Sequence, residues 1–181
     1  MDIIEAELKG VFLIKPKIFE DSRGYFFESY RENMLQEAGV DLNFVQDNMS
    51  KSSKNTIRGL HYQIENPQDK LVTCLVGEVL DVAVDIRKNS PTFGKCTSFV
   101  LSQSNHYSLL VPKGFAHGFS VLSDEAIISY KCSDYYNKAG ERGIRWDDSE
   151  IGVDWKVSNP ILSDKDKELP LFSAIQEKDL F

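Results

Sequence analysis

The stretch between residues 71 and 87 restricts the fold of this chain more than any other segment. It reads LVTCLVGEVLDVAVDIR, and in its second half apolar and mostly charged positions alternate: Leu80, Val82, Val84 and Ile86 against Asp81, Ala83, Asp85 and Arg87. Because successive side chains of a strand point to opposite faces, this period of two predicts extended structure. We therefore expect two strands around Gly77-Glu78, the second with one core face and one polar face.

Short strands recur along the chain with turn residues between them. The expected ranges are 11–19, 24–30, 44–48, 97–101, 108–111, 119–122 and 126–131. Regularly spaced strands of this kind are typical of a sandwich or barrel. A length of 181 residues fits one domain, so we expect residues 1–181 to form a single all-β domain.

Helices are expected to be few, short and peripheral. Residues 29–32 have capping-box spacing, and a helix over 32–38 would end at Gly39. The polar residues 50–55 are expected to form a surface loop. The tail, 152–181, is expected to wrap the barrel surface with one or two short helices.

The composition argues against several classes of partner. The formal net charge is −7, whereas binding to nucleic acid or to an anionic membrane needs clustered positive charge. Residues 1–10 lack a basic segment followed by an apolar run, so we expect no signal peptide, and no apolar stretch is long enough to span a membrane. Three cysteines without C-x-x-C spacing suit free thiols in a reducing cytoplasm.

The segment RGLHYQ, residues 58–63, holds one of only three histidines in the chain. On a strand, His61 shares a face with Gln63, while Leu60 and Tyr62 point to the opposite face. This arrangement would direct polar side chains into a cleft. A partly buried histidine without a chemical role fits the same segment equally well, so its context has to decide.

Residues 112–117, PKGFAH, fit the P-x-G-x-x-H pattern of the second cupin motif, whose histidine points into a barrel. Many cupins complete a metal site with H-x-H and a glutamate. Here the equivalent place holds His61-Tyr62-Gln63, and no glutamate follows at the usual spacing. Two imidazoles and a carboxamide bind a divalent metal poorly, so we expect no metal ion and no cofactor. Two inward histidines near basic residues instead suggest proton transfer beside an anionic ligand.

Nine segments, in their order along the chain, match the sequence pattern of one known family. They are 21–30 (DSRGYFFESY), 45–48 (VQDN), 58–63, 70–72, 77–87, 90–94 (SPTFG), 112–119, 130–136 and 162–166. Through them the chain resembles the dTDP-4-dehydrorhamnose 3,5-epimerase family over nearly its whole length. The resemblance implies a cupin-type jelly-roll barrel or sandwich and a homodimer. It also implies metal-free inversion at C3 and C5 of dTDP-4-dehydro-6-deoxy-D-glucose, which gives dTDP-4-dehydro-L-rhamnose.

Removing a proton next to a ketone is the energetic problem that this reaction poses. Such a proton is roughly a dozen pKa units less acidic than an imidazolium, which amounts to about 16 kcal/mol at about 1.36 kcal/mol per unit. A base alone cannot offset that difference, so fixed positive charge must meet the enolate oxygen. By the resemblance, Lys70 supplies this charge.

The resemblance also assigns the proton transfers. It implies that His61 is the general base and that Asp166 orients its ring, although the spacing Ser163-x-x-Asp166 would also suit an acid that only caps a helix. Inversion needs a proton from the opposite face, and the resemblance assigns that role to Tyr130. A tyrosine in the core of a strand is the alternative for this residue.

The other positions that match the family's substrate contacts are mostly polar. Arginine suits a diphosphate because its planar fork donates two hydrogen bonds at once, and a chain with a net charge of −7 needs such local attraction. His117 could equally be a structural histidine inside the barrel. The expected substrate-binding residues are Arg23, Glu28, Gln46, Asp47, Asn48, Arg58, Lys70, His117, Tyr136, Glu141 and Lys165.

Three other functions remain open at this point. The first is an epimerase that inverts only one carbon or acts on another nucleotide-linked 4-keto sugar. The second is a metal-dependent cupin isomerase or oxygenase, which Gln63 and the missing glutamate oppose. The third is a cupin that only binds sugar nucleotides, which the joint presence of the four expected catalytic residues opposes: His61, Asp166, Lys70 and Tyr130.

Overall fold

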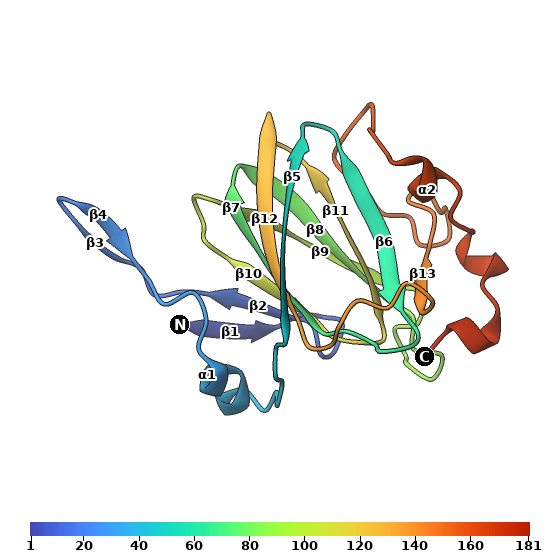
Figure 1. Ribbon diagram of the computed structural model, residues 1–181, viewed down its shortest axis with the longest axis horizontal. Helices are drawn as coiled ribbons and strands as arrows, with labels where there is room; N and C mark the ends of the chain where they lie inside the picture. Colours follow the sequence, from blue (N-terminus) through green and yellow to red (C-terminus); the bar gives the residue numbers. More distant parts are fainter.

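Two antiparallel sheets face each other in the computed structural model, which describes residues 1–181 (Figure 1). One sheet has six strands in the order β1 (Asp2–Glu5), β2 (Phe12–Lys15), β10 (Ser108–Val111), β7 (Lys70–Val76), β12 (Glu125–Cys132) and β5 (Gln46–Ser53). The other has five, in the order β13 (Glu141–Gly143), β6 (Ile57–Gln63), β11 (Phe115–Val121), β8 (Glu78–Asp85) and β9 (Cys96–Ser102). This architecture confirms the all-β, cupin-like expectation.

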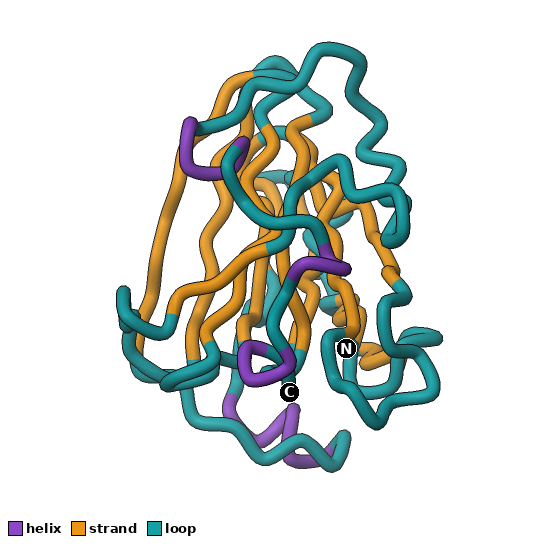
Figure 2. Tube along the Cα trace, turned by 90° about the vertical axis from the view of Figure 1, so that its right-hand side faces the viewer, coloured by secondary structure: helices purple, strands orange, loops and turns teal.

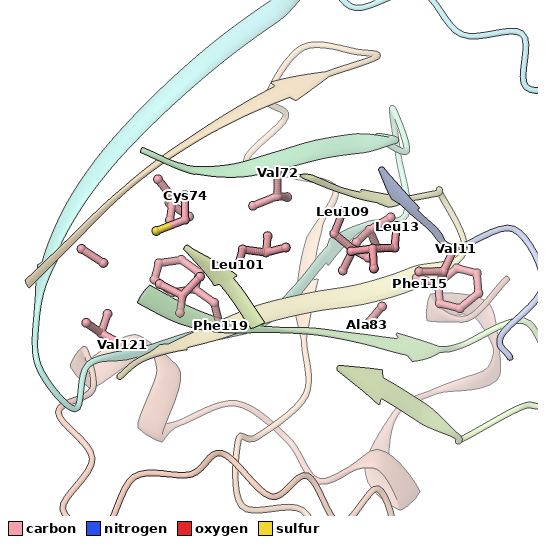
Figure 3. Close-up of a cluster of buried hydrophobic side chains, with 14 of the residues drawn as sticks. Val11, Leu13, Val72, Cys74, Ala83, Leu101, Leu109, Phe115, Phe119 and Val121 are labelled. Atoms are coloured by element: carbon pink, nitrogen blue, oxygen red, sulfur yellow. The ribbon is translucent and has the colours of Figure 1, made fainter. Parts of the chain in front are cut away.

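Apolar side chains from both sheets fill the space between the layers. The cluster holds 15 buried residues, among them Val72 and Cys74 of β7 and Phe119 and Val121 of β11 (Figure 3). Each buried apolar group stabilises the folded state by roughly 25 cal/mol per Å² of apolar surface that is removed from water. Burial on the two inner faces is therefore what holds the layers together.

The strand β8 is buried on both faces. The expected core face is present, but the expectation that the face with the aspartates is exposed as a polar surface was wrong. Its apolar residues, such as Val82, pack outward against the C-terminal tail. Asp81 and Asp85, on the other face, are also 0% exposed. Burial alone would raise the pKa of Asp85, but hydrogen bonds from Arg87, Ser90 and Thr92 lower it to about 2.

The C-terminal tail covers the outer face of the five-stranded sheet, as expected from the sequence. It contains α2 (Asp164–Lys167) and two short 3-10 helices, η1 (Phe172–Ala174) and η2 (Glu177–Asp179). These helices lie outside the strands (Figure 2). Trp155 and Phe172 are buried in the cluster that the tail forms with β6 and β8. The tail thereby brings α2 beside β6.

The N-terminal part contains a hairpin and one short helix. The hairpin of β3 (Phe19–Asp21) and β4 (Gly24–Phe26) projects away from both sheets (Figure 1). The helix α1 (Glu32–Glu37) ends before Gly39, as expected. The predicted capping box at 29–32 was wrong, because the N-cap is Arg31 and no side chain caps this end.

Several strand boundaries differ from the prediction. The segment 50–55 is mostly strand rather than loop, since β5 continues to Ser53 and pairs with β12 along its length. Its polar residues hid it, because one face lies toward solvent and the other lines a polar cavity. The strand β11 begins at Phe115 instead of residue 119, and β1 and β13 were not predicted. No helix is long and apolar enough to cross a membrane.

Candidate active site

A cavity of about 800 Å³ opens between the two sheets, with walls from both of them and from α2. This volume lies within the usual range for sites that bind small molecules. The residues expected from the sequence that line it are Gln46, Asn48, Arg58, His61, Lys70, His117, Tyr130, Tyr136, Glu141, Lys165 and Asp166. Residues that are distant in the sequence thus meet around one cavity.

His61 points from β6 into this cavity, and the neighbouring Leu60 and Tyr62 are buried in the outer cluster, as the alternation predicted. Its ring atom Nε2 lies 2.6 Å from Oδ1 of Asp166, which comes from α2. A hydrogen bond to the carboxylate assigns a proton to Nε2. The free ring nitrogen, available to a ligand, is therefore Nδ1.

Asp166 occupies the first turn of α2, where its backbone N–H and its side-chain carboxylate have different partners. Its backbone N–H donates to Oγ of Ser163, the N-cap, at 3.1 Å, so the serine half of the predicted cap is present. Its carboxylate bonds His61 instead. Burial raises the pKa of this carboxyl, but the hydrogen bond from His61 and the nearby positive charges hold it below its usual value. The side chain is therefore an ionised partner of the imidazole.

A close approach between β6 and β11 fixes the position of His61. At Gly59 the backbone has a φ of 131°, and a Cβ there would lie 2.5 Å from the Cα of Gly118. Only glycine tolerates both the conformation and the contact. The pairing register shifts beside this point, with His61 opposite His117 and Phe119 opposite Arg58.

Lys70 and Tyr130 lie on the facing sheet. Tyr130 of β12 pairs in register with Val72 of β7, and the next inward position on β7 is Lys70. Burial lowers the pKa of Lys70, while the charges of Asp81 and Glu141 oppose that shift. Burial raises the pKa of Tyr130, so its hydroxyl keeps its proton at neutral pH. The cavity thus has an imidazole on one wall and an amine and a phenol on the other.

A second histidine–aspartate pair lies beside the first. His117 Nε2 is 2.9 Å from Oδ1 of Asp81, on the adjacent strand β8. Asp81 is 0% exposed, and its Oδ2 has no hydrogen-bond partner. The sequence reasoning did not select Asp81, although a carboxylate among the apolar residues of β8 was a signal that could have found it.

Gln63, at the position of the second histidine of H-x-H, joins the loop after β6 to the loop after β12. Its Nε2 donates to the carbonyl oxygens of Asn66 and Tyr135 at 2.7 and 3.3 Å, and its Oε1 accepts from the N–H of Asn137 at 2.8 Å. No group of three or more His, Cys, Asp or Glu side chains lies close enough to hold a metal ion. The donor set of this cavity therefore does not fit the metal site that many cupins carry.

Polar networks organise the remaining cavity walls. Glu141 accepts from the Tyr136 hydroxyl at 2.8 Å and pairs with the Lys165 ammonium at 2.6 Å. Burial raises the pKa of Glu141, but these two partners hold it below its usual value. Gln46 and Asn48 bond to each other through their side chains at 3.1 Å. These groups surround the cavity with fixed donors and acceptors.

Three of the expected substrate-binding residues are not brought into this cavity. Asp47 points to the outer face of β5 and pairs with Lys131 at 3.0 Å. Arg23 is on the projecting hairpin, where its exposed side chain pairs with Asp21 at 2.6 Å. Glu28 follows the hairpin and pairs with Arg31 at 3.2 Å. Within one chain, these three residues lie apart from His61.

Comparisons with known proteins find similarity to one family over most of the chain. The family model described as dTDP-4-dehydrorhamnose 3,5-epimerase matches residues 5–174. A curated protein of that name from Shigella flexneri is 55% identical over 168 residues, which cover 92% of this chain and 93% of that protein.

Two solved structures extend the comparison. A dTDP-6-deoxy-D-glucose-3,5-epimerase from Legionella pneumophila, in complex with dTDP-4-keto-L-rhamnose, is 45% identical with a TM-score of 0.96, covering 99% of this chain and 96% of that one. A 3'-monoepimerase from Streptomyces bikiniensis, in complex with dTDP-quinovose, is 32% identical with a TM-score of 0.88, covering 93% of this chain and 87% of that one. Both proteins are similar to this chain over nearly its whole length.

Proposed function

This chain belongs to the dTDP-4-dehydrorhamnose 3,5-epimerase family, and from that premise we propose that it is an isomerase that inverts C3 and C5 of dTDP-4-dehydro-6-deoxy-D-glucose. The product is dTDP-4-dehydro-L-rhamnose. The observation that carries the proposal is the His61–Asp166 pair, with 2.6 Å between Nε2 and Oδ1, in a cavity whose facing wall holds Lys70 and Tyr130.

His61 is the base in this proposal, and Nδ1 is the atom that takes the proton from carbon. Nε2 is occupied by Asp166, whose lowered pKa keeps it ionised. An ionised carboxylate fixes the ring orientation and stabilises the imidazolium that forms when Nδ1 accepts the proton. Without this carboxylate the imidazolium would be less stable, so removing the proton from carbon would cost more free energy.

Lys70 stabilises the enolate. When the proton next to the ketone leaves, its bonding electrons move into the ring and negative charge collects on the ketone oxygen. An ammonium held in a partly buried wall needs little reorganisation to meet that charge, and a low local dielectric strengthens the interaction. The position of Lys70 across the cavity from His61 supports this role.

Tyr130 returns a proton to the opposite face of the planar enolate. Its raised pKa supports the role of a donor that holds its proton until the carbanion forms. Each inversion leaves His61 with one additional proton and Tyr130 with one fewer. Both groups must therefore exchange protons with solvent through the open cavity before the second carbon reacts.

No metal enters the proposed reaction. Gln63 is engaged by Asn66 in the loop after β6 and by Tyr135 and Asn137 in the loop after β12. The lack of a suitable cluster of ligands around His61 supports proton transfer by side chains alone. Removing metals with a chelator should therefore leave turnover intact. Activity that disappears with the chelator and returns with an added metal would contradict this part of the proposal.

A homodimer is the proposed assembly. The hairpin β3–β4 projects from the barrel and exposes Phe19, Tyr25 and Phe26, which are 54%, 59% and 71% exposed. Exposed aromatic residues on a projecting arm favour contact with a second chain. Such a contact would also offer Arg23 to the cavity of the partner, where its guanidinium could bind the diphosphate.

Incubation with dTDP-4-dehydro-6-deoxy-D-glucose in deuterated water tests the proposed reaction. NMR of the ring protons should show deuterium at both C3 and C5 and a product inverted at both carbons. Label and inversion at only one carbon would identify a monoepimerase, the activity of the Streptomyces bikiniensis relative. Binding without any label would indicate a protein that only holds the sugar nucleotide.

A further inference from the structure

The inner face of β5 carries a row of polar residues along the cavity. Gln46, Asn48, Ser50 and Ser52 all line it. Three of these side chains have partners inside the chain: Gln46 and Asn48 bond to each other at 3.1 Å, and Ser52 Oγ accepts from Nε of Arg58 at 2.9 Å. The Ser50 hydroxyl is shielded from solvent and has no hydrogen-bond partner. It is the one unsatisfied position in the row.

An unsatisfied hydroxyl is unfavourable in the free protein. Roughly 90% or more of buried polar groups in proteins have a partner, because a buried donor without one keeps the cost of its lost hydration. The cross-strand neighbour of Ser50 is Ile128, whose side chain offers no acceptor. Alanine would avoid this cost without adding volume. Because Ser50 lines the cavity, rotation about its Cα–Cβ bond can turn the hydroxyl toward an acceptor that arrives with a ligand.

The neighbours of Ser50 indicate which part of a ligand reaches it. On one side, Asn48 is in register with Tyr130, at the reacting end of the cavity. On the other side, Arg58 is tethered to the residues that follow Ser50, through Ser52 Oγ and through the carbonyl oxygen of Lys51 at 3.3 Å. A sugar between His61 and Tyr130 and a diphosphate near Arg58 would be joined beside Ser50.

We propose that the Ser50 hydroxyl donates a hydrogen bond to a non-bridging oxygen of the phosphate attached to the sugar, which makes Ser50 a further substrate-positioning residue. The inference rests on the proposed function, since that function supplies the nucleoside diphospho-sugar. Ser50 anchors the sugar-proximal phosphate between Arg58 and the reacting ring. It acts on binding and alignment and takes no part in proton transfer.

Binding of two nucleotides to Ser50→Ala tests this inference. Calorimetry should show dTDP bound about tenfold more weakly than by wild type, the loss of one hydrogen bond to a charged group. Binding of dTMP, which lacks the second phosphate, should be unchanged. Ser98→Ala is the matched control, because Ser98 is an exposed serine on β9 and does not line the cavity.

Kinetics and melting temperature separate positioning from structure. Ser50→Ala should raise KM about tenfold and change kcat less than about threefold, while its melting temperature stays equal to or above that of wild type. Equal losses for dTDP and dTMP, or a lower melting temperature with unchanged dTDP affinity, would overturn the inference. If wild type turns over the substrate and Ser50→Ala is equally active, only this inference is overturned. A wild-type protein that neither binds dTDP nor epimerises overturns the proposed function as well.

Discussion

The two histidine–aspartate pairs of this barrel have similar contacts but different surroundings. His61 and His117 are register partners on β6 and β11, and each presents Nε2 to a carboxylate, at 2.6 and 2.9 Å respectively. The carboxylate of the first pair, Asp166, comes from the C-terminal tail. The carboxylate of the second, Asp81, comes from β8 inside the same sheet. The same pair of residue types is thus built once across two elements and once within one sheet.

The difference in exposure separates the roles of the two pairs. The His61 side chain is 30% exposed toward the cavity, whereas the His117 side chain is 10% exposed and Asp81 is completely buried with one oxygen unpaired. A base must reach its substrate and exchange its proton with solvent, which favours His61. The less exposed His117 is better suited to hold a substrate group in place than to exchange protons. Residue type alone would not distinguish them; burial and the origin of the carboxylate do.

Replacing the histidine of each pair should produce the largest difference. His61→Ala should lower turnover at least about a thousandfold and stop deuterium uptake at both carbons, since it removes the proposed base. His117→Ala should retain deuterium uptake and mainly raise KM. Turnover and label uptake can be followed together by NMR in deuterated water. If His117→Ala abolished exchange while His61→Ala retained it, the two roles would have to be reversed.

Removing the charge of the first carboxylate should have the next largest effect. Asp166→Asn keeps the shape of the side chain and its place in α2 but no longer supports an imidazolium. We expect turnover to fall about a hundredfold, within the usual range for acid–base groups, with a folded protein by circular dichroism. Full turnover with a lower melting temperature would instead assign Asp166 to capping α2.

Removing the charge of the second carboxylate, Asp81, should lower turnover less and should raise the stability of the fold. Asp81→Asn removes a buried charge that has one unpaired oxygen, and the amide can still bond His117. We expect turnover to fall about tenfold or less, together with a higher melting temperature, because a completely buried carboxylate with an unsatisfied oxygen keeps a large desolvation cost. Differential scanning calorimetry with steady-state kinetics measures both. A loss as large as that of Asp166→Asn would end the proposed distinction.

The smallest effect concerns the acid stability of the first pair. The pKa of Asp166 lies below its usual value of 3.8, so its ionised form favours the folded state. That contribution is fully present above this usual value and is lost as the pH falls through the lower folded pKa. The melting temperature of Asp166→Asn relative to wild type should therefore be lower at neutral pH than below pH 3.8. A difference that stays constant across this range would show that the His61 contact adds no stability.

The sequence predicted the parts of this molecule that follow local chemistry. The period of two in β8 and the glycine after α1 marked their elements correctly, and the motif around His61 indicated the face that lines the cavity. Local patterns failed where long-range packing decides. The polar strand β5 has no hydrophobic alternation to reveal it, and the complete burial of Asp81 depends on packing between the two sheets, although its apolar neighbours on β8 were a local signal.

The candidate site divides in the same way. Most expected residues meet around one cavity, although they come from segments between Gln46 and Asp166. Alternation on a strand separates Asp47 from Gln46 and Asn48, but only the pairing of β5 with β12 shows which of the two faces lines the cavity. Nor could it reveal the unsatisfied hydroxyl of Ser50, which depends on the surroundings of a single atom.

The facing positions of His61 and Tyr130 are the central claim, and one variant tests it most directly. Tyr130→Phe keeps the ring and its packing but removes the proton that inversion needs. NMR in deuterated water should then show label entering next to the ketone while the sugar largely returns to its starting configuration, because His61 exchanges the abstracted proton with solvent and delivers a deuteron to the same face. Exchange without epimerisation is the predicted result. Inversion at the wild-type rate would contradict the account and leave the donor to another group.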